Sequence, residues 1–186
     1  MGTYTTIPQS TFEEMQLDAG ILLTNFDPAQ PAVVDANILC ATTGGINIVA
    51  EPTYSDLGED VDNVPTNMKE LKHLDSWDCR IETTGLGTSP ALIQRALGAA
   101  DIDATDNTKV TIRRDLNQAD FKTLWWVGDK ADGGFVAIKL INALSTAGFS
   151  LQTTKNGKGQ TSLTFTGHVS MNEQSTMPME FYSIDG

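Results

Sequence analysis

The sequence predicts a mostly β protein, an antiparallel β-sandwich or barrel with one or two short flanking α-helices. Apolar and polar side chains alternate from Trp77 to Thr84, with the period of two that is typical of a half-buried strand. Asn156-Gly157 stands between two further runs, 149–154 and 160–171, and this arrangement is a strong hairpin signature. Helix signals occur in only two short segments. We therefore expect a sheet-based core with a helix packed against it.

Five other segments have the alternating or continuously apolar character of strands, namely 20–26, 46–54, 110–112, 135–143 and 179–184. The run 135–143 is the most continuously apolar, so we expect it at the centre of a sheet. Pro52 cannot donate a hydrogen bond to a neighbouring strand. It should therefore weaken the far end of its strand or place that strand at a sheet edge.

The two helix signals differ in kind. Ser89-Pro90 supplies an N-cap residue and a proline at the first helical position, and the apolar residues of 92–97 share one face before Gly98. A second helix is expected from Asn117 to Gly128, because Asp120 lies in its first turn. That helix would bring together three large apolar side chains, those of Phe121, Leu124 and Trp125.

A chain of 186 residues is of the size of one domain, so we expect a single domain over 1–186. Residues 1–31 contain three prolines and no sustained period, which predicts an extended N-terminal arm. Residues 55–70 are predicted to form a long acidic loop, because 55–64 is acidic, poor in large apolar side chains and followed by Pro65. The first residues do not resemble a secretory signal, so synthesis in the cytoplasm is expected.

The net charge of −12 is distributed unevenly along the chain. Residues 1–68 contain ten acidic side chains and no Lys or Arg, and all twelve basic side chains lie between Lys69 and Lys158. Binding to nucleic acid by counterion release requires clustered basic side chains facing phosphates. The composition therefore argues against a nucleic-acid-binding protein.

No catalytic, cofactor-binding or metal-binding motif is recognisable. His73 and His168 have no sequence neighbour that would make either one a catalytic base, and a surface or interface role is favoured for His168. Cys40 and Cys79 lack the spacing of a zinc site and are interpreted as small buried side chains. The carboxylates of 59–62 and of 101–106 do not fit the EF-hand pattern, so they are interpreted as solvated turns. The prediction is no enzyme, no cofactor and no metal.

The second half contains an ordered series of short segments: NQADFKTL at 117–124, ALSTAGFSL at 143–151, KGQ at 158–160, FTGH at 165–168 and MPMEF at 177–181. In this order and spacing the series resembles the major tail protein, or tail tube protein, family of tailed bacteriophages. The resemblance covers roughly residues 75–185. None of the segments is a catalytic motif.

This resemblance implies a tail-tube-like β-sandwich or barrel whose copies form hexameric rings that stack into a tube. The subunit would be a structural protein of the virion tail, assembled in the host cytoplasm, with no membrane contact. Its other partners would be tail proteins such as the tape measure, the terminator and the baseplate or tip. DNA would pass through the tube during ejection without specific binding, and an acidic lumen would favour this because it repels phosphates.

Two sets of residues are candidates for contacts between subunits. The acidic loop would contact a neighbouring ring through Ser55, Asp56, Leu57, Glu59, Asp60, Asp62 and Asn63. The polar, uncharged face of the strand after Gly159 would pack between subunits through Ser162, Thr164, Thr166, His168 and Ser170.

An alternative function comes from a different class of protein. A β-sandwich module could bind carbohydrate or a cell surface by using Trp77, Trp125 or Trp126 as a stacking platform, with calcium in an acidic loop. Assembly into rings or fibres would favour the tube subunit. A strictly monomeric protein with calcium-dependent thermal stability would favour the binding module.

Overall fold

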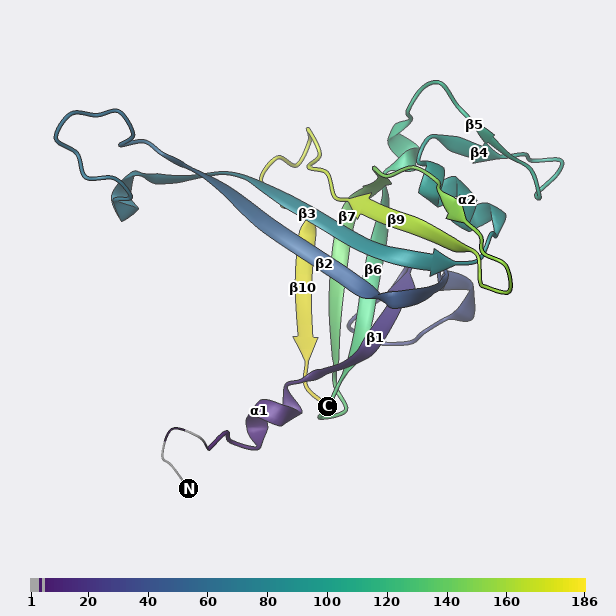
Figure 1. The fold of residues 1–186 in the computed structure, drawn as a ribbon, viewed down its shortest axis with the longest axis horizontal. Coiled ribbons are helices and arrows are strands. Elements are labelled where there is room, and N and C mark those ends of the chain that lie inside the picture. Colours follow the sequence, from purple (N-terminus) through teal and green to yellow (C-terminus); the bar gives the residue numbers. More distant parts are fainter. Residues whose placement is uncertain (1–3, 5) are drawn as a thin grey trace.

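The structure is a computed structural model that describes residue 4 and residues 6–186, and it consists mainly of two antiparallel sheets (Figure 1). The first sheet has the order β1 (Gln16–Leu23), β6 (Lys122–Lys130), β7 (Phe135–Ser145) and β10 (Met179–Ile184). The second sheet continues from the end of β7 through β9 (Gln160–Thr166) and β3 (Lys72–Leu86) to β2 (Ala41–Asp56), and the short β8 (Leu151–Gln152) also pairs with β9. A separate ribbon joins β4 (Ala100–Ile102) and β5 (Val110–Ile112). The predicted mostly β, antiparallel fold with short helices is confirmed.

Strand β7 belongs to both sheets. Up to Ala143 it pairs with β6 and β10, and then Leu144 and Ser145 pair with β9. Asn142 has a φ of 49°, and asparagine tolerates this left-handed conformation better than most residues. The backbone irregularity at Asn142 therefore lies where the strand passes from one sheet to the other.

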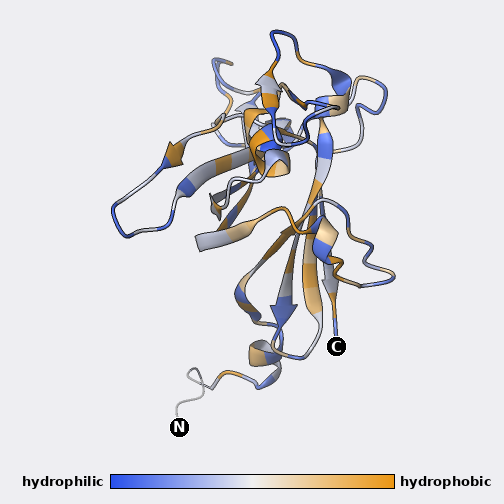
Figure 2. Cartoon of the chain, turned by 90° about the vertical axis from the view of Figure 1, so that its right-hand side faces the viewer, coloured by the Kyte–Doolittle hydropathy of each residue, from blue (hydrophilic) through white to orange (hydrophobic). Residues whose placement is uncertain are grey.

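The main core lies between the two sheets and under helix α2 (Pro90–Leu97). Its buried residues come from both sheets, from α2 and from the segment before β2: Leu22, Leu39, Cys79, Ile81, Leu92, Ala96, Leu124, Trp126, Ile138, Leu140, Ala143, Leu163, Phe165 and Met179. A second cluster on the other face of the first sheet contains Phe26, Trp125 and Val127. Figure 2 shows the hydrophobic residues concentrated in the strands of the body, whereas most turns are hydrophilic.

The first predicted helix is confirmed as α2. The Ser89 side chain accepts a hydrogen bond from the Leu92 amide at 3.3 Å, and Pro90 is the first helical residue. Leu92 and Ala96 bury the apolar face of the helix in the core. The short helix α1 (Ser10–Glu13) and the 3-10 turns η1 (Asp35–Asn37) and η2 (Lys69–Leu71) were not expected from the sequence.

The second predicted helix, at 117–128, is wrong. Asn117 and Asp120 do form a reciprocal capping box, but it begins only the 3-10 turn η3 (Gln118–Asp120). The chain then enters β6, whose residues 124–128 are all buried between β1 and β7. A central strand that is covered on both faces has a continuous apolar run, and such a run carries no strand periodicity to oppose the helix signal.

The predicted N-terminal arm, 1–31, is shorter than expected because β1 lies within it and pairs with β6. Gly20 has a φ of +66° and packs against β6 so closely that an added Cβ would lie 2.5 Å from the Val127 carbonyl oxygen. The Trp126 indole donates a hydrogen bond to the Ala19 carbonyl oxygen at 2.9 Å. Residues 16–23 are therefore part of the sheet, and among the described residues α1 and its flanks project from the body (Figure 1). Residues 1–3 and 5 lie outside the described part of the predicted arm.

Strands β2 and β3 form a long hairpin that reaches well beyond the body (Figure 1). They pair from Ala41 opposite Leu86 to Asp56 opposite Lys72, and residues 57–71 connect them at the far end. The predicted loop, 55–70, coincides with this connection except that β2 continues through Asp56. Strand β2 is the last strand of its sheet, so the expectation that Pro52 lies on an edge strand is confirmed.

Candidate functional site

The distal half of the β2–β3 hairpin carries an uncovered apolar face. Pro52 is paired with Trp77 and Tyr54 with Leu74, so these four side chains lie on one face. We call them the hairpin stripe. The next pair toward the body on this face is Ala50 with Cys79, which lies two residues from the pair Pro52 with Trp77 on each strand. The stripe therefore continues the face of the sheet that forms the core.

Burial changes abruptly along this face. Cys79 is buried, whereas Trp77 is 37% exposed, Leu74 42% and Tyr54 53%. The sandwich is shorter than the hairpin, so the core does not extend beneath the distal half. A soluble monomer gains nothing from an apolar face with no second layer, and contiguous apolar surface of this kind marks interaction sites.

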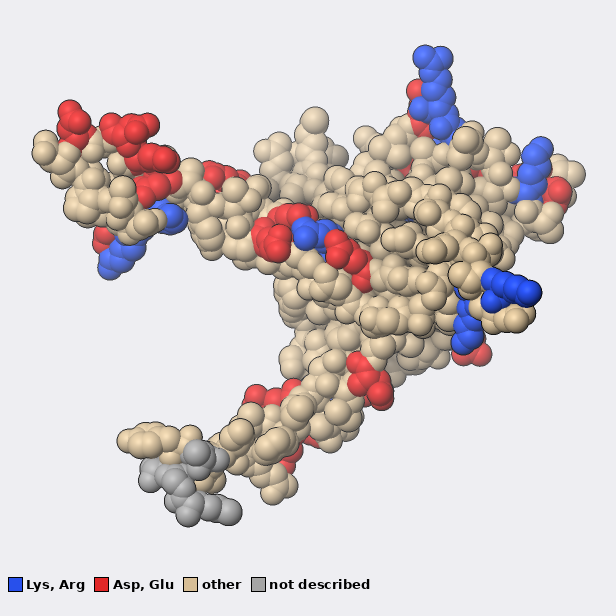
Figure 3. Space-filling model, in the orientation of Figure 1, with Lys and Arg blue, Asp and Glu red and all other residues tan. Residues whose placement is uncertain are grey.

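The predicted loop contacts all lie at the tip of the hairpin. Leu57 is 64% exposed, and Glu59, Asp60 and Asp62 are exposed as well. None of these three carboxylates forms an ion pair within the part of the chain that the structure describes. Figure 3 shows acidic side chains gathered at this tip.

Two of the predicted contact residues, Asp56 and Ser55, also form hydrogen bonds within the hairpin end. Asp56 accepts hydrogen bonds from the Asn67 amide at 2.8 Å and the Gly58 amide at 3.0 Å, and these bonds hold the pKa of its carboxyl below the ordinary value. The Ser55 hydroxyl donates to the Asp75 carboxylate at 2.9 Å. The loop thus has a defined shape that fixes where its free carboxylates lie.

The predicted polar face of β9 is divided by the structure. Ser162, Thr164 and Thr166 share one face of the strand and lie opposite Thr84, Glu82 and Arg80 of β3. Beside Ser162 and Thr164 there is a shallow groove of about 480 Å³, bordered by the Gly44-Gly45 bulge of β2. These three of the five residues do form part of one open sheet surface.

The neighbouring strand β3 brings charged side chains to the centre of this surface. Arg80 donates to Glu82 at 2.9 Å, also pairs with Asp78, and lies 3.6 Å from Glu51. The hydrogen bonds from Asn47 and Arg80 lower the pKa of Glu82, so it remains ionised. The alternation of side chains along β9 does not indicate which strand pairs with it. The charges come from that neighbouring strand, β3.

His168 and Ser170 lie beyond the end of β9 on a different surface. The His168 ring contacts Phe121 edge to face with centroids 5.2 Å apart, and its Nδ1 lies 3.2 Å from the Asn142 carbonyl oxygen. Both residues border a second groove of about 440 Å³, together with Met171, which is 86% exposed. The histidine is held by packing and backbone contacts.

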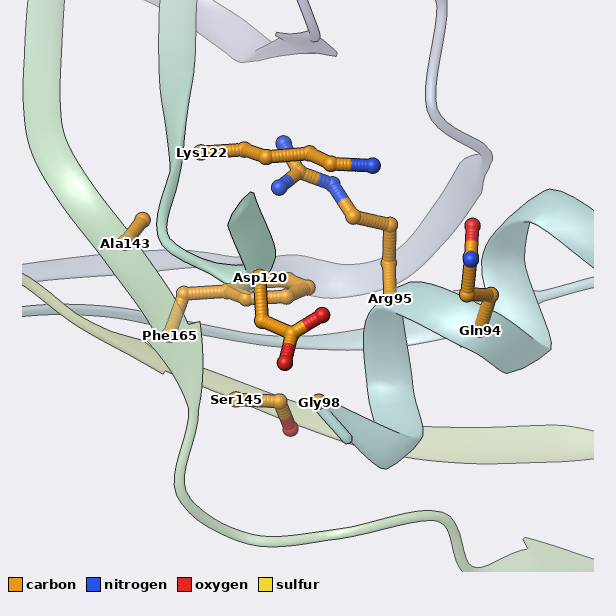
Figure 4. Close-up of a pocket in the computed structure, with 8 residues that line it drawn as sticks. All are labelled: Gln94, Arg95, Gly98, Asp120, Lys122, Ala143, Ser145 and Phe165. Atoms are coloured by element: carbon orange, nitrogen blue, oxygen red, sulfur yellow. The ribbon is translucent and has the colours of Figure 1, made fainter. Parts of the chain in front are cut away.

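A small polar cavity lies between α2 and η3 (Figure 4). Arg95, Asp120 and Ser145 line it, and its volume of about 10 Å³ is about that needed for one water molecule. The Arg95 guanidinium donates to the Thr123 carbonyl oxygen at 3.0 Å, and burial lowers its pKa. Asp120 pairs with Arg113 and caps η3. The residues around the cavity link α2, η3 and β6 to one another, and the cavity itself is too small for a substrate.

The acidic turn at 101–106 is stabilised by its own backbone. Asp103 accepts from the amides of Thr105 and Asp106, and Asp106 accepts from Thr108; these bonds lower the pKa of both carboxyls. Across residue 4 and residues 6–186, no group of three His, Cys, Asp or Glu side chains is arranged to hold a metal ion. Asp103 and Asp106 are turn caps in this structure, and Asp101 pairs with Arg113.

The stacking platform of the alternative function is contradicted for two of its three tryptophans. Trp125 and Trp126 are only 6% and 7% exposed, because both lie in the central strand β6. Only Trp77 presents an accessible ring, and it belongs to the hairpin stripe.

No family model matches the chain, and no curated protein matches it. Within the described residues, no helix has the length and apolar character needed to cross a membrane.

Proposed function

We propose that this chain is a structural subunit that assembles into hexameric rings stacked as the tail tube of a bacteriophage, a conduit with an acidic lumen for DNA ejection. The observation that carries the proposal is the hairpin stripe. The stripe continues the core-facing side of the sheet to a part of the hairpin that no second layer covers. The hairpin extends far from the body, and another protein chain can pack against this face.

The sheet edges support the same conclusion. Strand β2 presents 16 residues at the edge of its sheet, and exposed edges of this length are prone to pairing with other chains. A monomer would be expected to keep such an edge short or cover it. A subunit of an assembly can leave it open, because a neighbour covers it in the assembled state.

The charge supports the conduit part of the proposal. DNA carries about one phosphate charge per 1.7 Å of axis, so a wall through which it slides must not bind it. A net charge of −12 fits a wall that repels phosphates. The carbohydrate-binding alternative is not retained, because Trp125 and Trp126 are buried and the accessible Trp77 belongs to the hairpin stripe.

Sedimentation velocity and negative-stain microscopy of the purified protein at increasing concentration test the proposal. We expect rings of six and tubes. A protein that stays monomeric at every concentration would falsify it.

A loop deletion tests the role of the hairpin tip. Removing residues 56–63 should leave a soluble folded protein that forms no tubes, because the free carboxylates and Leu57 are lost while the sandwich is untouched. Circular dichroism checks the fold, and microscopy checks the tubes. Normal tubes from this deletion would contradict the role of the loop.

A further inference from the structure

The hairpin stripe and the acidic tip lie at one end of the molecule, where Lys69 and Lys72 accompany the carboxylates, and most of the other basic groups lie elsewhere. In Figure 3, the Lys and Arg side chains on the visible face gather mainly toward the end of the body opposite the hairpin tip. Figure 1 places the β8–β9 turn and the β4–β5 turn at that end. The molecule is therefore electrically asymmetric along its longest axis.

The β8–β9 turn is the most purely basic part of this end. Lys155 and Lys158 are both exposed, and no acidic residue occurs anywhere in 144–172. Neither lysine forms an ion pair with any residue that the structure describes. The β4–β5 turn is different, because Lys109 is accompanied by Asp103 and Asp106.

The same end also offers an apolar side chain. Leu151 of β8 is 42% exposed and lies on the strand that leads into the basic turn. An apolar residue followed by two unpaired lysines complements a hairpin on which apolar residues are followed by unpaired carboxylates. Complementary surfaces of this kind set which partner binds and in which orientation.

We propose that the distal β2–β3 hairpin of one copy binds the β8–β9 turn of a second copy in the next ring. The hairpin stripe covers Leu151, and Lys155 and Lys158 face Glu59 and Asp62. This inference rests on the proposed function and names the receiving surface of the hairpin. Because the two surfaces are different patches of the same chain, the contact is heterologous and can repeat without limit.

Charge reversal on each side provides the test. Lys155→Glu with Lys158→Glu places acids against acids, and Glu59→Lys with Asp62→Lys places bases against bases. Each double variant should raise the critical concentration for tube formation at least about tenfold, because several attractions become repulsions. Asp60 is left unchanged, since its φ of 63° suits aspartate better than lysine.

The quadruple variant decides the matter. A chain with all four reversals restores opposite charges across the contact, so its critical concentration should return to within about threefold of the wild type. The matched control is Arg114→Glu with Lys122→Glu, which makes the same change in net charge at exposed positions outside the turn. This control should assemble like the wild type.

The failures of the two proposals are distinguishable. If the wild type forms tubes but the quadruple variant assembles no better than either double variant, the contact between hairpin and turn is wrong and the tube function stands. Normal assembly of the Lys155/Lys158 variant leads to the same conclusion. If the wild type forms no rings or tubes, both proposals are wrong.

Discussion

Replacing Trp77 with serine is expected to weaken assembly strongly while leaving the monomer folded. Trp77 is 37% exposed, and a tryptophan presents about 200–250 Å² in full, so about 80 Å² of its surface remains for a partner to cover. At about 25 cal/mol per Å², covering that area contributes about 2 kcal/mol per subunit. Losing it raises the critical concentration about 30-fold, since each 1.4 kcal/mol corresponds to a factor of ten.

The assay is sedimentation of tubes over a concentration series, with thermal unfolding of the unassembled protein as the check on the fold. Trp77→Phe is the matched control, because it keeps most of the apolar area and should change the critical concentration only a few-fold. Intrinsic fluorescence gives a second measurement. Trp125 and Trp126 are already buried, so a blue shift on assembly reports mainly on Trp77. Unchanged assembly of the serine variant, or no shift in the wild type, would refute the role of the hairpin stripe.

Two further predictions concern the fold and the loop. Gly20→Ala should destabilise the protein by about 2 kcal/mol or more, because its methyl group would lie 2.5 Å from a carbonyl oxygen of β6. Gly44 is the matched control: it has a similar positive φ but nothing within 4 Å, so Gly44→Ala should cost only about 1 kcal/mol. Thermal unfolding measures both, and equal losses would contradict the steric explanation. The lowered pKa of Asp56 means that its contribution to loop stability is complete above the ordinary value of 3.8 and is lost as the pH falls through the lower folded value. Amide exchange at Gly58 and Asn67, corrected for its intrinsic rate, should therefore accelerate at acid pH in the wild type. The same amides should exchange rapidly at all pH values in Asp56→Ala, which lacks both acceptor oxygens. A pH-independent wild type would contradict this assignment.

Much of the fold could be predicted because local signals and tertiary structure agree. The cap at Ser89 and the proline that follows it began a helix where expected, and 179–184 form β10 with the predicted bounds. Strand β6 could not be predicted in this way. Its residues are buried on both faces, and the capping box at Asn117 is the same at the start of a 3-10 turn as at the start of a longer helix.

The candidate site was only partly predictable. The loop tip was found because its composition is extreme. The hairpin stripe was missed because Trp77 alternates in phase with Cys79 and Ile81, and alternation cannot distinguish a covered face from an uncovered one. Strand length is the signal that could have found it, since 16 residues exceed what a small sandwich can cover. The charges beside β9 could not be foreseen because they depend on strand order.

The hairpin lies at one end of the molecule only, and this has a consequence for a tube assembled as proposed. A polymer built by inserting that hairpin into the next ring is polar: one terminus presents a crown of acidic tips, and the other presents basic turns. Growth at the two termini then differs in rate, and a protein that stops elongation at one terminus does not fit the other. A positively charged factor suits the crown of hairpins, whereas an acidic one suits the opposite terminus.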